Sequence, residues 1–440
     1  MREERSGGKC TGRARGSATA AQLFGSARDT NRKVTSSEAI AQGLSDEGGL
    51  FVPESFPQVD VRALCELDYP ALAAAVIREY LTDYSPEFLA QAACTTYGEA
   101  FGGKAGYLAS VEGDTYALEL WHGPTCAFKD YANLGRTEKT LILVATSGDT
   151  GKAALDGYHD IPGVEIAVFY PTGGTSEIQR LQMATQEGAN VAVYAVRGNF
   201  DDAQTGVKKV FGDKAIAAEL EQRGIRLSSA NSINWGRLVP QIVYYFAAYA
   251  QLLKAGKIAF GDAVDFCVPT GNFGDILAGY YAKRMGLPVG KLVCASNENN
   301  VLTDFLTTGT YTAKRGWSSE KEVAGEIRAR YEQDGYLCDT HTAVAFHVAA
   351  QKKRSGVPMV VLSTASPFKF PRSVLEALGR TAPENDFEAM QQLRKPMRQR
   401  EAATGHAAPA SLAALRQKAE RFDTVIDPAQ IAEVALGYQA

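Results

Sequence analysis

Short apolar runs alternate with helical segments from about residue 114 onward. The runs are rich in β-branched residues and lack strict alternation of polar and apolar positions, as in strands that are covered on both faces. We expect strands at residues 141–146, 164–170, 190–196, 263–268, 291–296 and 359–362. We expect helices between them at residues 176–186, 202–211, 239–254 and 276–285. This alternation predicts an α/β fold, with open, mostly parallel twisted sheets and helices on both faces.

A chain of 440 residues is longer than one hydrophobic core usually supports, so several domains are expected. Helical spacing near residues 37–42, 69–81 and 86–101 predicts a mostly helical N-terminal domain over residues 29–113. Residues 1–28 are rich in Gly and Arg and offer too little apolar surface to fold. We interpret them as a disordered extension or the result of a start codon assigned too early; a transit peptide is the less favoured alternative.

Composition excludes several classes of function. A net charge of −4 gives no electrostatic argument for binding nucleic acid or a membrane surface, and no apolar run approaches the ~18 residues that span a bilayer. The seven cysteines are scattered without a Cys-x-x-Cys pair, and the five histidines form no His-Glu-x-x-His motif. We therefore expect no disulfide framework and no metal site, and a reducing, cytoplasmic location. Nothing in the sequence indicates an oligomeric state.

Lys129 is the first candidate catalytic residue. It follows a Gly-Pro turn at residues 123–124 and an apolar Cys-Ala-Phe run at residues 126–128. A lysine in apolar surroundings has a lowered pKa, because burial disfavours its charged form. The neutral amine can attack an aldehyde, and pyridoxal phosphate is the commonest aldehyde that bonds to a protein lysine. The alternative is a surface lysine at the start of a helix.

Two glycine-containing loops each join a predicted strand to a predicted helix. Residues 268–275 could place several backbone N–H groups around a phosphate, but they lack the Walker lysine and the dinucleotide-binding spacing. Residues 145–152 offer Ser147 and Thr150 as donors to an oxyanion. Asp149 would repel a phosphate, which indicates another task, such as contact with a cofactor ring hydroxyl or a substrate ammonium. An ordinary turn remains the alternative for the first loop, and simple helix capping for the second.

Two further loops are dense in short polar side chains. Residues 171–176 precede a helix with a Ser-x-x-Gln capping box, and residues 230–237 include Arg237, which could grip a phosphate through two hydrogen bonds. Because ligands bind beyond the carboxyl ends of parallel strands, we expect these loops and Lys129 to lie at one edge of the fold.

Taken in chain order, these motifs resemble the threonine synthases, which are pyridoxal-phosphate enzymes of the fold-type II family that also contains tryptophan synthase β. The matching segments are residues 47–53, 122–125, 128–130, 147–151, 198–202, 231–235, 271–274, 363–367 and 369–371. The resemblance runs from about residue 34 to near the C-terminus and is carried by the ordered set of motifs.

The resemblance implies a role for each candidate residue. Lys129 would bond to pyridoxal phosphate and then serve as the base at the substrate Cα. The cofactor would also contact Gly271, Asn272, Phe273 and Gly274 through its phosphate, Thr364 through its pyridine nitrogen, and Asp149. The substrate O-phosphohomoserine would contact Ser147, Thr150, Asn234 and Arg237. The products would be L-threonine and phosphate. The large, cofactor-binding domain would comprise residues 114–136 and 213–440, and a small domain of residues 137–212 would close on the substrate.

The segment after Lys129 departs from the family pattern, in which a full helix occupies this position. Only 17 residues separate Lys129 from Ser147, and the predicted strand takes six of them. We predict at most two helical turns there, ending at Gly135. A tolerated deletion, a sequence assembly error and a damaged enzyme would each explain the shortening. The alternatives to a threonine-forming enzyme are a phospho-lyase that releases a keto acid, an inactive relative and, last, a metal hydrolase.

Overall fold

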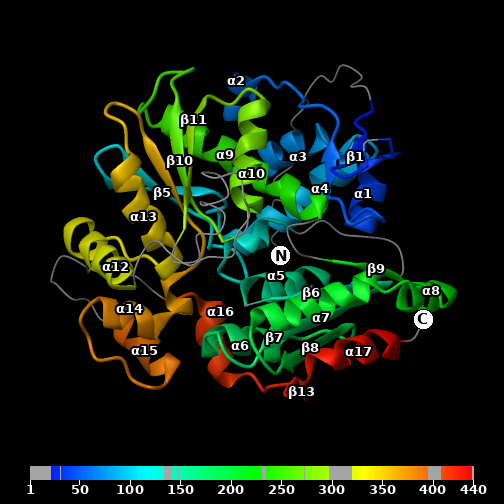
Figure 1. Ribbon diagram of the computed structural model, residues 1–440. Helices are drawn as coiled ribbons and strands as arrows, with labels where there is room; N and C mark the ends of the chain where they lie inside the picture. Colours follow the sequence, from blue (N-terminus) through cyan, green and yellow to red (C-terminus); the bar gives the residue numbers. More distant parts are fainter. Residues whose placement is uncertain are drawn as a thin grey trace, which may run out of the picture.

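The computed structural model describes residues 21–29, 31–132, 140–146, 148–229, 234–271, 273–296, 320–394 and 408–438. Within these ranges the chain forms two five-stranded sheets and one three-stranded antiparallel sheet. The two larger sheets lie one above the other. The sheet that contains β10 (Val264–Pro269) lies in the upper half of Figure 1, and the sheet that contains β7 (Val164–Pro171) lies in the lower half. Each helix of the described ranges is too short or too polar to cross a lipid bilayer.

The large sheet has the strand order β11-β10-β12-β5-β4. Its strands are β11 (Val289–Ala295), β10 (Val264–Pro269), β12 (Met359–Ser363), β5 (Thr115–Glu119) and β4 (Tyr107–Glu112). The first four are parallel and β4 runs antiparallel to β5. Neighbouring residues face opposite sides, so Phe266 joins the core under α9 (Trp235–Lys254) and α10 (Gly274–Arg284), whereas Cys267 joins the core under α13 (Thr340–Lys352). Both faces are therefore covered. Further helices on the α13 side are α12 (Glu320–Asp334), α14 (Pro371–Ala377) and α15 (Asp386–Leu393).

The small sheet has the order β13-β8-β7-β6-β9, with all neighbours parallel. Its strands are β13 (Val425–Ile426), β8 (Val191–Val196), β7 (Val164–Pro171), β6 (Thr140–Ala145) and β9 (Arg226–Ser228). Its helices are α5 (Asp149–Tyr158), α6 (Glu177–Ala184), α7 (Phe200–Gly212), α8 (Lys214–Gln222) and α17 (Ile431–Gly437). Val144 faces α5, and Leu143 faces α7 and α17. This sheet also has helices on both faces.

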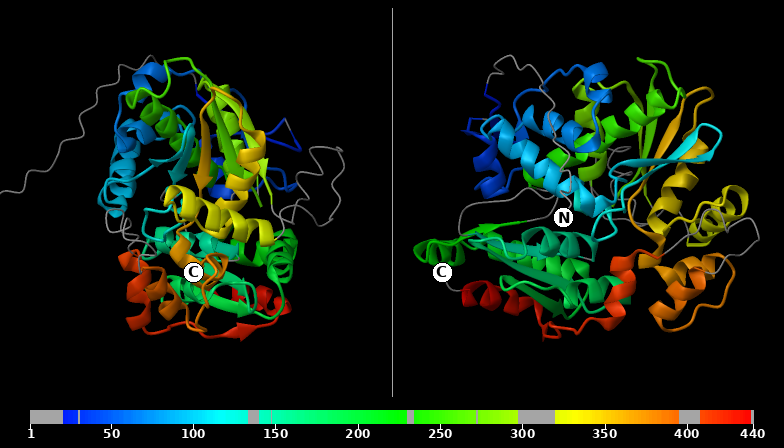
Figure 2. Two further views of the ribbon diagram at one scale, coloured as in Figure 1. Left: turned by 90° about the vertical axis from the view of Figure 1, so that its left-hand side faces the viewer. Right: turned by 180° about the vertical axis from the view of Figure 1, so that it is seen from behind.

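The N-terminal part packs onto α9 and shares its core with the large sheet. One hydrophobic cluster runs from Phe24 through α9 to Leu362. Trp235, in the first turn of α9, contacts the rings of Phe24 and Tyr80. Figure 2 shows these N-terminal helices beside the upper sheet in both views. The elements are β1 (Phe24–Ser26), β2 (Lys33–Val34), α1 (Ser36–Gln42), β3 (Phe51–Pro53), α2 (Val61–Cys65), α3 (Tyr69–Arg78) and α4 (Pro86–Tyr97).

The expected fold class is confirmed, and the six predicted strands and four predicted α/β helices are present with ends shifted by a few residues. The capping box of α6 also forms, between Ser176 and Gln179. The prediction missed β5, the strand that leads to Lys129. The helix expected after the loop at residues 145–152 is α5.

The sheets divide the chain differently from the expected domain ranges. β1 lies in the stretch assigned to the extension, yet it pairs with β2 and β3. β4, assigned to the N-terminal domain, belongs to the large sheet, and β9 and β13, assigned to the large domain, belong to the small sheet. Strands this short leave little local pattern, and β9 and β13 pair with strands from distant parts of the chain, which is why sequence spacing placed these boundaries elsewhere. Residues 1–20 lie outside the described residues.

Candidate active site

The described part of the Lys129 loop comprises residues 120–132. It follows β5 of the large sheet and precedes β6 of the small sheet, so it connects the two sheets. Its conformation is held by Asp130, whose carboxylate accepts hydrogen bonds from the Thr125 N–H at 2.9 Å and from the Thr125 hydroxyl at 2.5 Å. Gly123 is required there, since a Cβ atom would lie 2.4 Å from the Asp130 carboxylate. Cys126 adopts a φ of 58°, which is uncommon for a residue with a side chain. The loop is therefore tightly wound around a buried carboxylate.

Lys129 lies in η2 (Phe128–Ala132), a short 3₁₀-helix, and its side chain is buried, with a relative exposure of 8%. Burial lowers the pKa of Lys129 to about 8, and the nearby Arg237 charge adds to this effect. The carboxylates of Asp275 and Asp149 act in the opposite direction. Since a pKa near 8 leaves about a tenth of the amine neutral at pH 7, Lys129 is far more nucleophilic than an exposed lysine. The rest of the short helix predicted after Lys129, over residues 133–139, lies outside the described residues.

The segment that follows β12 lies directly against the Lys129 loop. The Phe128 N–H donates to the Thr364 carbonyl at 2.9 Å, and the Ser366 N–H donates to the Cys126 carbonyl at 3.1 Å. Ala127 and Ala365 form an antiparallel bridge between these hydrogen bonds. Thr364 is therefore next to Lys129, as the expectation of a shared site requires.

The glycine-containing turn after β10 leads into α10, which has 11 residues and begins at Gly274 after Phe273 as N-cap. A Cβ atom on Gly271 would meet no described atom within 4 Å, so there is open space beside this turn. Backbone N–H groups at such a helix N-terminus attract anions. Gly271, Phe273 and Gly274 thus stand where a phosphate could bind, whereas Asn272 lies outside the described residues.

Asp275 brings a buried carboxylate close to this turn and to Lys129. Its Oδ1 accepts hydrogen bonds from the Tyr244 hydroxyl at 2.5 Å and the Tyr245 hydroxyl at 3.1 Å, while its Oδ2 has no hydrogen-bond partner among the described residues. Burial raises the pKa of Asp275 to about 6, against the effects of the Tyr244 hydrogen bond and the Lys129 charge. The sequence prediction missed Asp275. Its only signal was a carboxylate in the first turn of the helix behind the glycines.

The second predicted loop leads into α5. The Thr146 hydroxyl oxygen accepts hydrogen bonds from the N–H groups of Gly148 and Gly151. Asp149 is therefore not a capping residue. Its Oδ1 lies 2.6 Å from Lys369 Nζ and accepts a hydrogen bond from Gln179. Thr150 is half-buried in the first turn of α5, and Ser147 lies outside the described residues.

Asn234 and Arg237 occupy the N-terminal end of α9, which packs against η2. Asn234 caps the helix. Its amide N–H groups donate to the carbonyls of Ile40 and Ser229, and its oxygen accepts the Gly236 N–H. These contacts give Asn234 a structural role at the start of α9, and its contact with a substrate stays a prediction. Arg237 is buried close enough to Lys129 to lower its pKa, as expected for a residue of the same site. Residues 230–233 lie outside the described residues.

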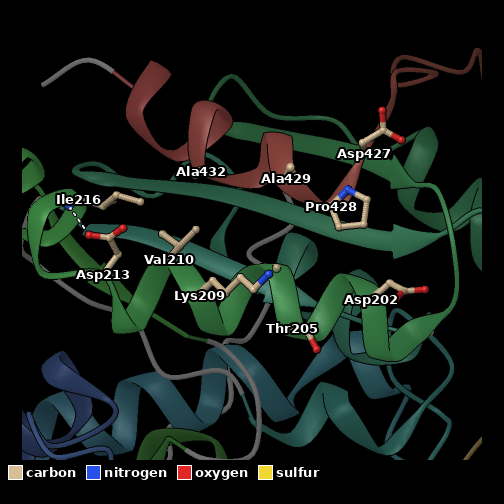
Figure 3. A pocket seen from close by; sticks show the side chains of 11 residues that line it. Asp202, Thr205, Lys209, Val210, Asp213, Ile216, Asp427, Pro428, Ala429 and Ala432 are labelled. Carbon is tan, nitrogen blue, oxygen red and sulfur yellow. Dashed lines mark hydrogen bonds between the residues drawn. The ribbon is translucent and has the colours of Figure 1, made fainter.

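A surface cavity of about 640 Å³ lies elsewhere, on the α7 and α17 side of the small sheet (Figure 3). Its carboxylates already have structural partners. Asp202 and Asp213 cap helices α7 and α8, and Asp427 pairs with Arg197 at 3.1 Å. Because η2 contacts α5, on the opposite face of the sheet, this cavity is separate from the Lys129 site.

Two open sheets of mostly parallel strands, with a buried lysine in the chain segment that joins them, define the architecture of fold-type II pyridoxal-phosphate enzymes. Family models described as "Threonine synthase N terminus" and "Threonine synthase, C-terminal" match residues 23–97 and 342–435. A threonine synthase from Pseudomonas aeruginosa is 34% identical over 417 residues, which covers 77% of this chain and 87% of that protein.

A solved structure of a pyridoxal-phosphate-bound threonine synthase from Brucella melitensis superposes with a TM-score of 0.77 and 30% identity, covering 94% of this chain and 99% of that one. The human protein "Threonine synthase-like 1" is 34% identical over 439 residues, or 80% of this chain, and the chain spans 59% of that relative's length. The chain belongs to the threonine synthase family.

Proposed function

We propose that this chain holds pyridoxal phosphate on Lys129 and converts O-phospho-L-homoserine and water to L-threonine and inorganic phosphate. The observation that carries the proposal is the buried amine of Lys129, with a pKa of about 8, next to Thr364 and within the electrostatic reach of Asp275 behind the glycine turn. A lysine with this pKa is suited both to bond to an aldehyde and to carry a proton near neutral pH.

The residues around Lys129 fit the cofactor. Gly271 borders open space, and the N-terminus of α10 supplies N–H groups for the cofactor phosphate. We assign Thr364 as the neutral hydroxyl partner of the pyridine nitrogen, and the hydrogen bond from the Phe128 N–H to the Thr364 carbonyl supports this assignment. Gly274 and Phe273 complete the described part of the turn. When bound, pyridoxal phosphate supplies an electron sink that makes the substrate Cα and Cβ hydrogens acidic.

The protein residues then have distinct tasks. The amine of Lys129, once released by the substrate, removes the Cα proton and returns it at the end of the reaction. Arg237 and Thr150 bind the substrate phosphate, which leaves from Cγ, and water adds at Cβ. Arg237 is well suited to this because its guanidinium is always charged and can donate two hydrogen bonds to one phosphate. Burial of the site around Lys129 limits access of other water molecules.

A second outcome is a phospho-lyase that releases phosphate and a keto acid from the same substrate. Its support is the short segment of 17 residues between Lys129 and Ser147, together with the 34% identity to relatives named "Threonine synthase-like 1". A shorter segment removes packing beside Lys129, and a misplacement of about 1 Å at a reacting group can cost on the order of a hundredfold in rate.

The test uses purified full-length protein and O-phospho-L-homoserine. Borohydride reduction followed by peptide mapping should find the cofactor on Lys129, and threonine and phosphate should form in equal amounts. Phosphate with a keto acid in place of threonine would establish the phospho-lyase reaction. A colourless protein with no fixed cofactor would overturn both.

A further inference from the structure

Lys369 is a second buried lysine near the active site. It ends η3 (Pro367–Lys369), three residues after Ser366, and has a relative exposure of 0%. Its ammonium lies 2.6 Å from Asp149 Oδ1 and donates to the Thr125 carbonyl at 3.0 Å. A buried ammonium is costly unless it is paired and hydrogen-bonded, so these contacts fix the position of the side chain.

These contacts join three segments of the site. Thr125 belongs to the Lys129 loop, where it donates two hydrogen bonds to Asp130. Asp149 opens α5, directly before Thr150. The backbone of Lys369 is itself held, because its carbonyl accepts the Ser176 hydroxyl at 2.8 Å. Lys369 therefore links the Lys129 loop of the large sheet to the α5 N-terminus of the small sheet.

The same contacts solve an electrostatic difficulty at α5. An unpaired Asp149 carboxylate, one residue from Thr150, would repel an anionic substrate. Burial alone would raise the pKa of Asp149, yet the adjacent Lys369 ammonium lowers it below its ordinary value, with smaller contributions from Gln179 and His341. The carboxylate is thus charged, and its charge is balanced by Lys369.

We propose that Lys369 is a positioning residue that neutralises Asp149, so that the N-terminus of α5 accepts the phosphate group of the substrate at a fixed distance from Lys129. This inference rests on the proposed function. It adds that the preference for a phosphate-bearing substrate depends on an ion pair between half-buried Asp149 and the buried ammonium of Lys369, from the segment that also carries Thr364.

The test compares wild type with Lys369→Met and the double variant Asp149→Asn/Lys369→Met. Inorganic phosphate is titrated into protein whose cofactor has been fixed by borohydride, so that the cofactor phosphate site is filled. Lys369→Met should weaken phosphate binding at least about tenfold, because an unbalanced carboxylate remains. The double variant should recover most of that loss, since neither charge is left. In turnover, Lys369→Met should raise KM for O-phosphohomoserine by a similar factor.

Lys152→Met is the matched control, because it also removes one positive charge near the start of α5, where Lys152 pairs with Asp156 at 3.2 Å. It should leave phosphate binding within about twofold of wild type. Equal losses in Lys369→Met and the double variant would overturn the inference and show a purely structural role, as would unchanged phosphate binding in Lys369→Met. If the four proteins show the expected phosphate affinities but wild type makes no threonine, the proposed function alone would be overturned. If wild type makes threonine but the variants do not show the expected phosphate affinities, the inference alone would be overturned.

Discussion

Lys129 owes its chemical character first to burial and then to the charges that surround it. Burial and Arg237 lower its pKa, while Asp275 and Asp149 partly restore it. The balance leaves a pKa of about 8, at which the amine can both donate and accept a proton near neutral pH. Asp149 is also paired with Lys369, so Asp275 is the carboxylate whose negative charge bears most directly on Lys129.

Replacing Lys129 by Ala should abolish fixation of the cofactor by borohydride and lower kcat by about a thousandfold or more, because both the covalent attachment and the base are lost. Mass spectrometry of the reduced protein and the rate of phosphate release measure the two effects. Lys283→Ala, which alters an exposed lysine of α10, is the control and should behave as wild type. Cofactor fixed to another lysine in Lys129→Ala would contradict the assignment.

Asp275→Asn should lower the pKa of Lys129 further, by on the order of one pH unit, because a negative charge near the ammonium is removed. The measurement is the rate at which the cofactor-free protein is trapped with pyridoxal and borohydride as a function of pH. The midpoint of this profile should lie near pH 8 in wild type and at lower pH in the variant. Tyr245→Phe keeps the carboxylate and should shift the midpoint less; a midpoint that moves upward in Asp275→Asn would refute the argument.

Lys129 could be predicted from the sequence, whereas Asp275 and Lys369 could not. The Gly-Pro turn and the apolar residues before Lys129 are adjacent in the chain and signal burial locally. Asp275 and Lys369 acquire their environments from Tyr244, Thr125 and Asp149, which lie between 31 and 244 residues away. No local pattern encodes such contacts.

At the scale of single elements, two turns position the reacting groups. The Lys129 loop is full, since a Cβ on Gly123 would collide with Asp130 and with the ring of Phe101. The turn before α10 is open, since a Cβ on Gly271 would meet no described atom. Filled space indicates that a glycine serves the fold, and empty space beside a helix N-terminus is consistent with a ligand.

Alanine substitutions should therefore separate the two turns. Gly123→Ala should lower the free energy of unfolding by about 1–3 kcal/mol, because Asp130 must move. Gly271→Ala should leave it within about 0.5 kcal/mol of wild type but weaken binding of pyridoxal phosphate, because the new methyl group takes up ligand space. Urea unfolding of the cofactor-free proteins and a cofactor titration give both values. Gly271→Ala protein with unaltered cofactor affinity would exclude this turn as the phosphate site.

The elements themselves were predicted to different degrees. Strands such as β6 and β7 are apolar except for Thr140 and Glu165, because helices cover both faces, and this pattern is visible in the sequence. β5 was missed because its five residues begin with Thr115 at the end of a hairpin with β4, where apolar and polar residues mix. η2 ends at Ala132, and the rest of the segment that was predicted to be short lies outside the described residues.

At the scale of the whole molecule, each sheet is completed by chain that is distant in sequence. The N-terminal helices share the core of the large sheet, and β13 and α17 at the C-terminal end join the small sheet (Figure 1). α17 packs on α7, where Ile431 lies against Gly206 so closely that a Cβ there would be 2.5 Å from the Ile431 side chain. The small sheet, and with it the α5 N-terminus, thus depends on the last residues of the chain.

Ile431→Ala should accordingly destabilise the small sheet by about 2–5 kcal/mol, because the Ile431 side chain is fully buried and its removal leaves a cavity. The measurement is hydrogen exchange followed by peptide mass spectrometry, because large proteins commonly open in separate units, and we expect protection to be lost in β6, β7 and α5 before the large sheet. Val425→Ala, in the exposed part of β13, is the control and should cost less than about 0.5 kcal/mol. If Ile431→Ala lowered protection equally in β10 and β12, the two sheets would form one cooperative unit. If it altered protection nowhere, α17 would contribute nothing to the fold of the small sheet.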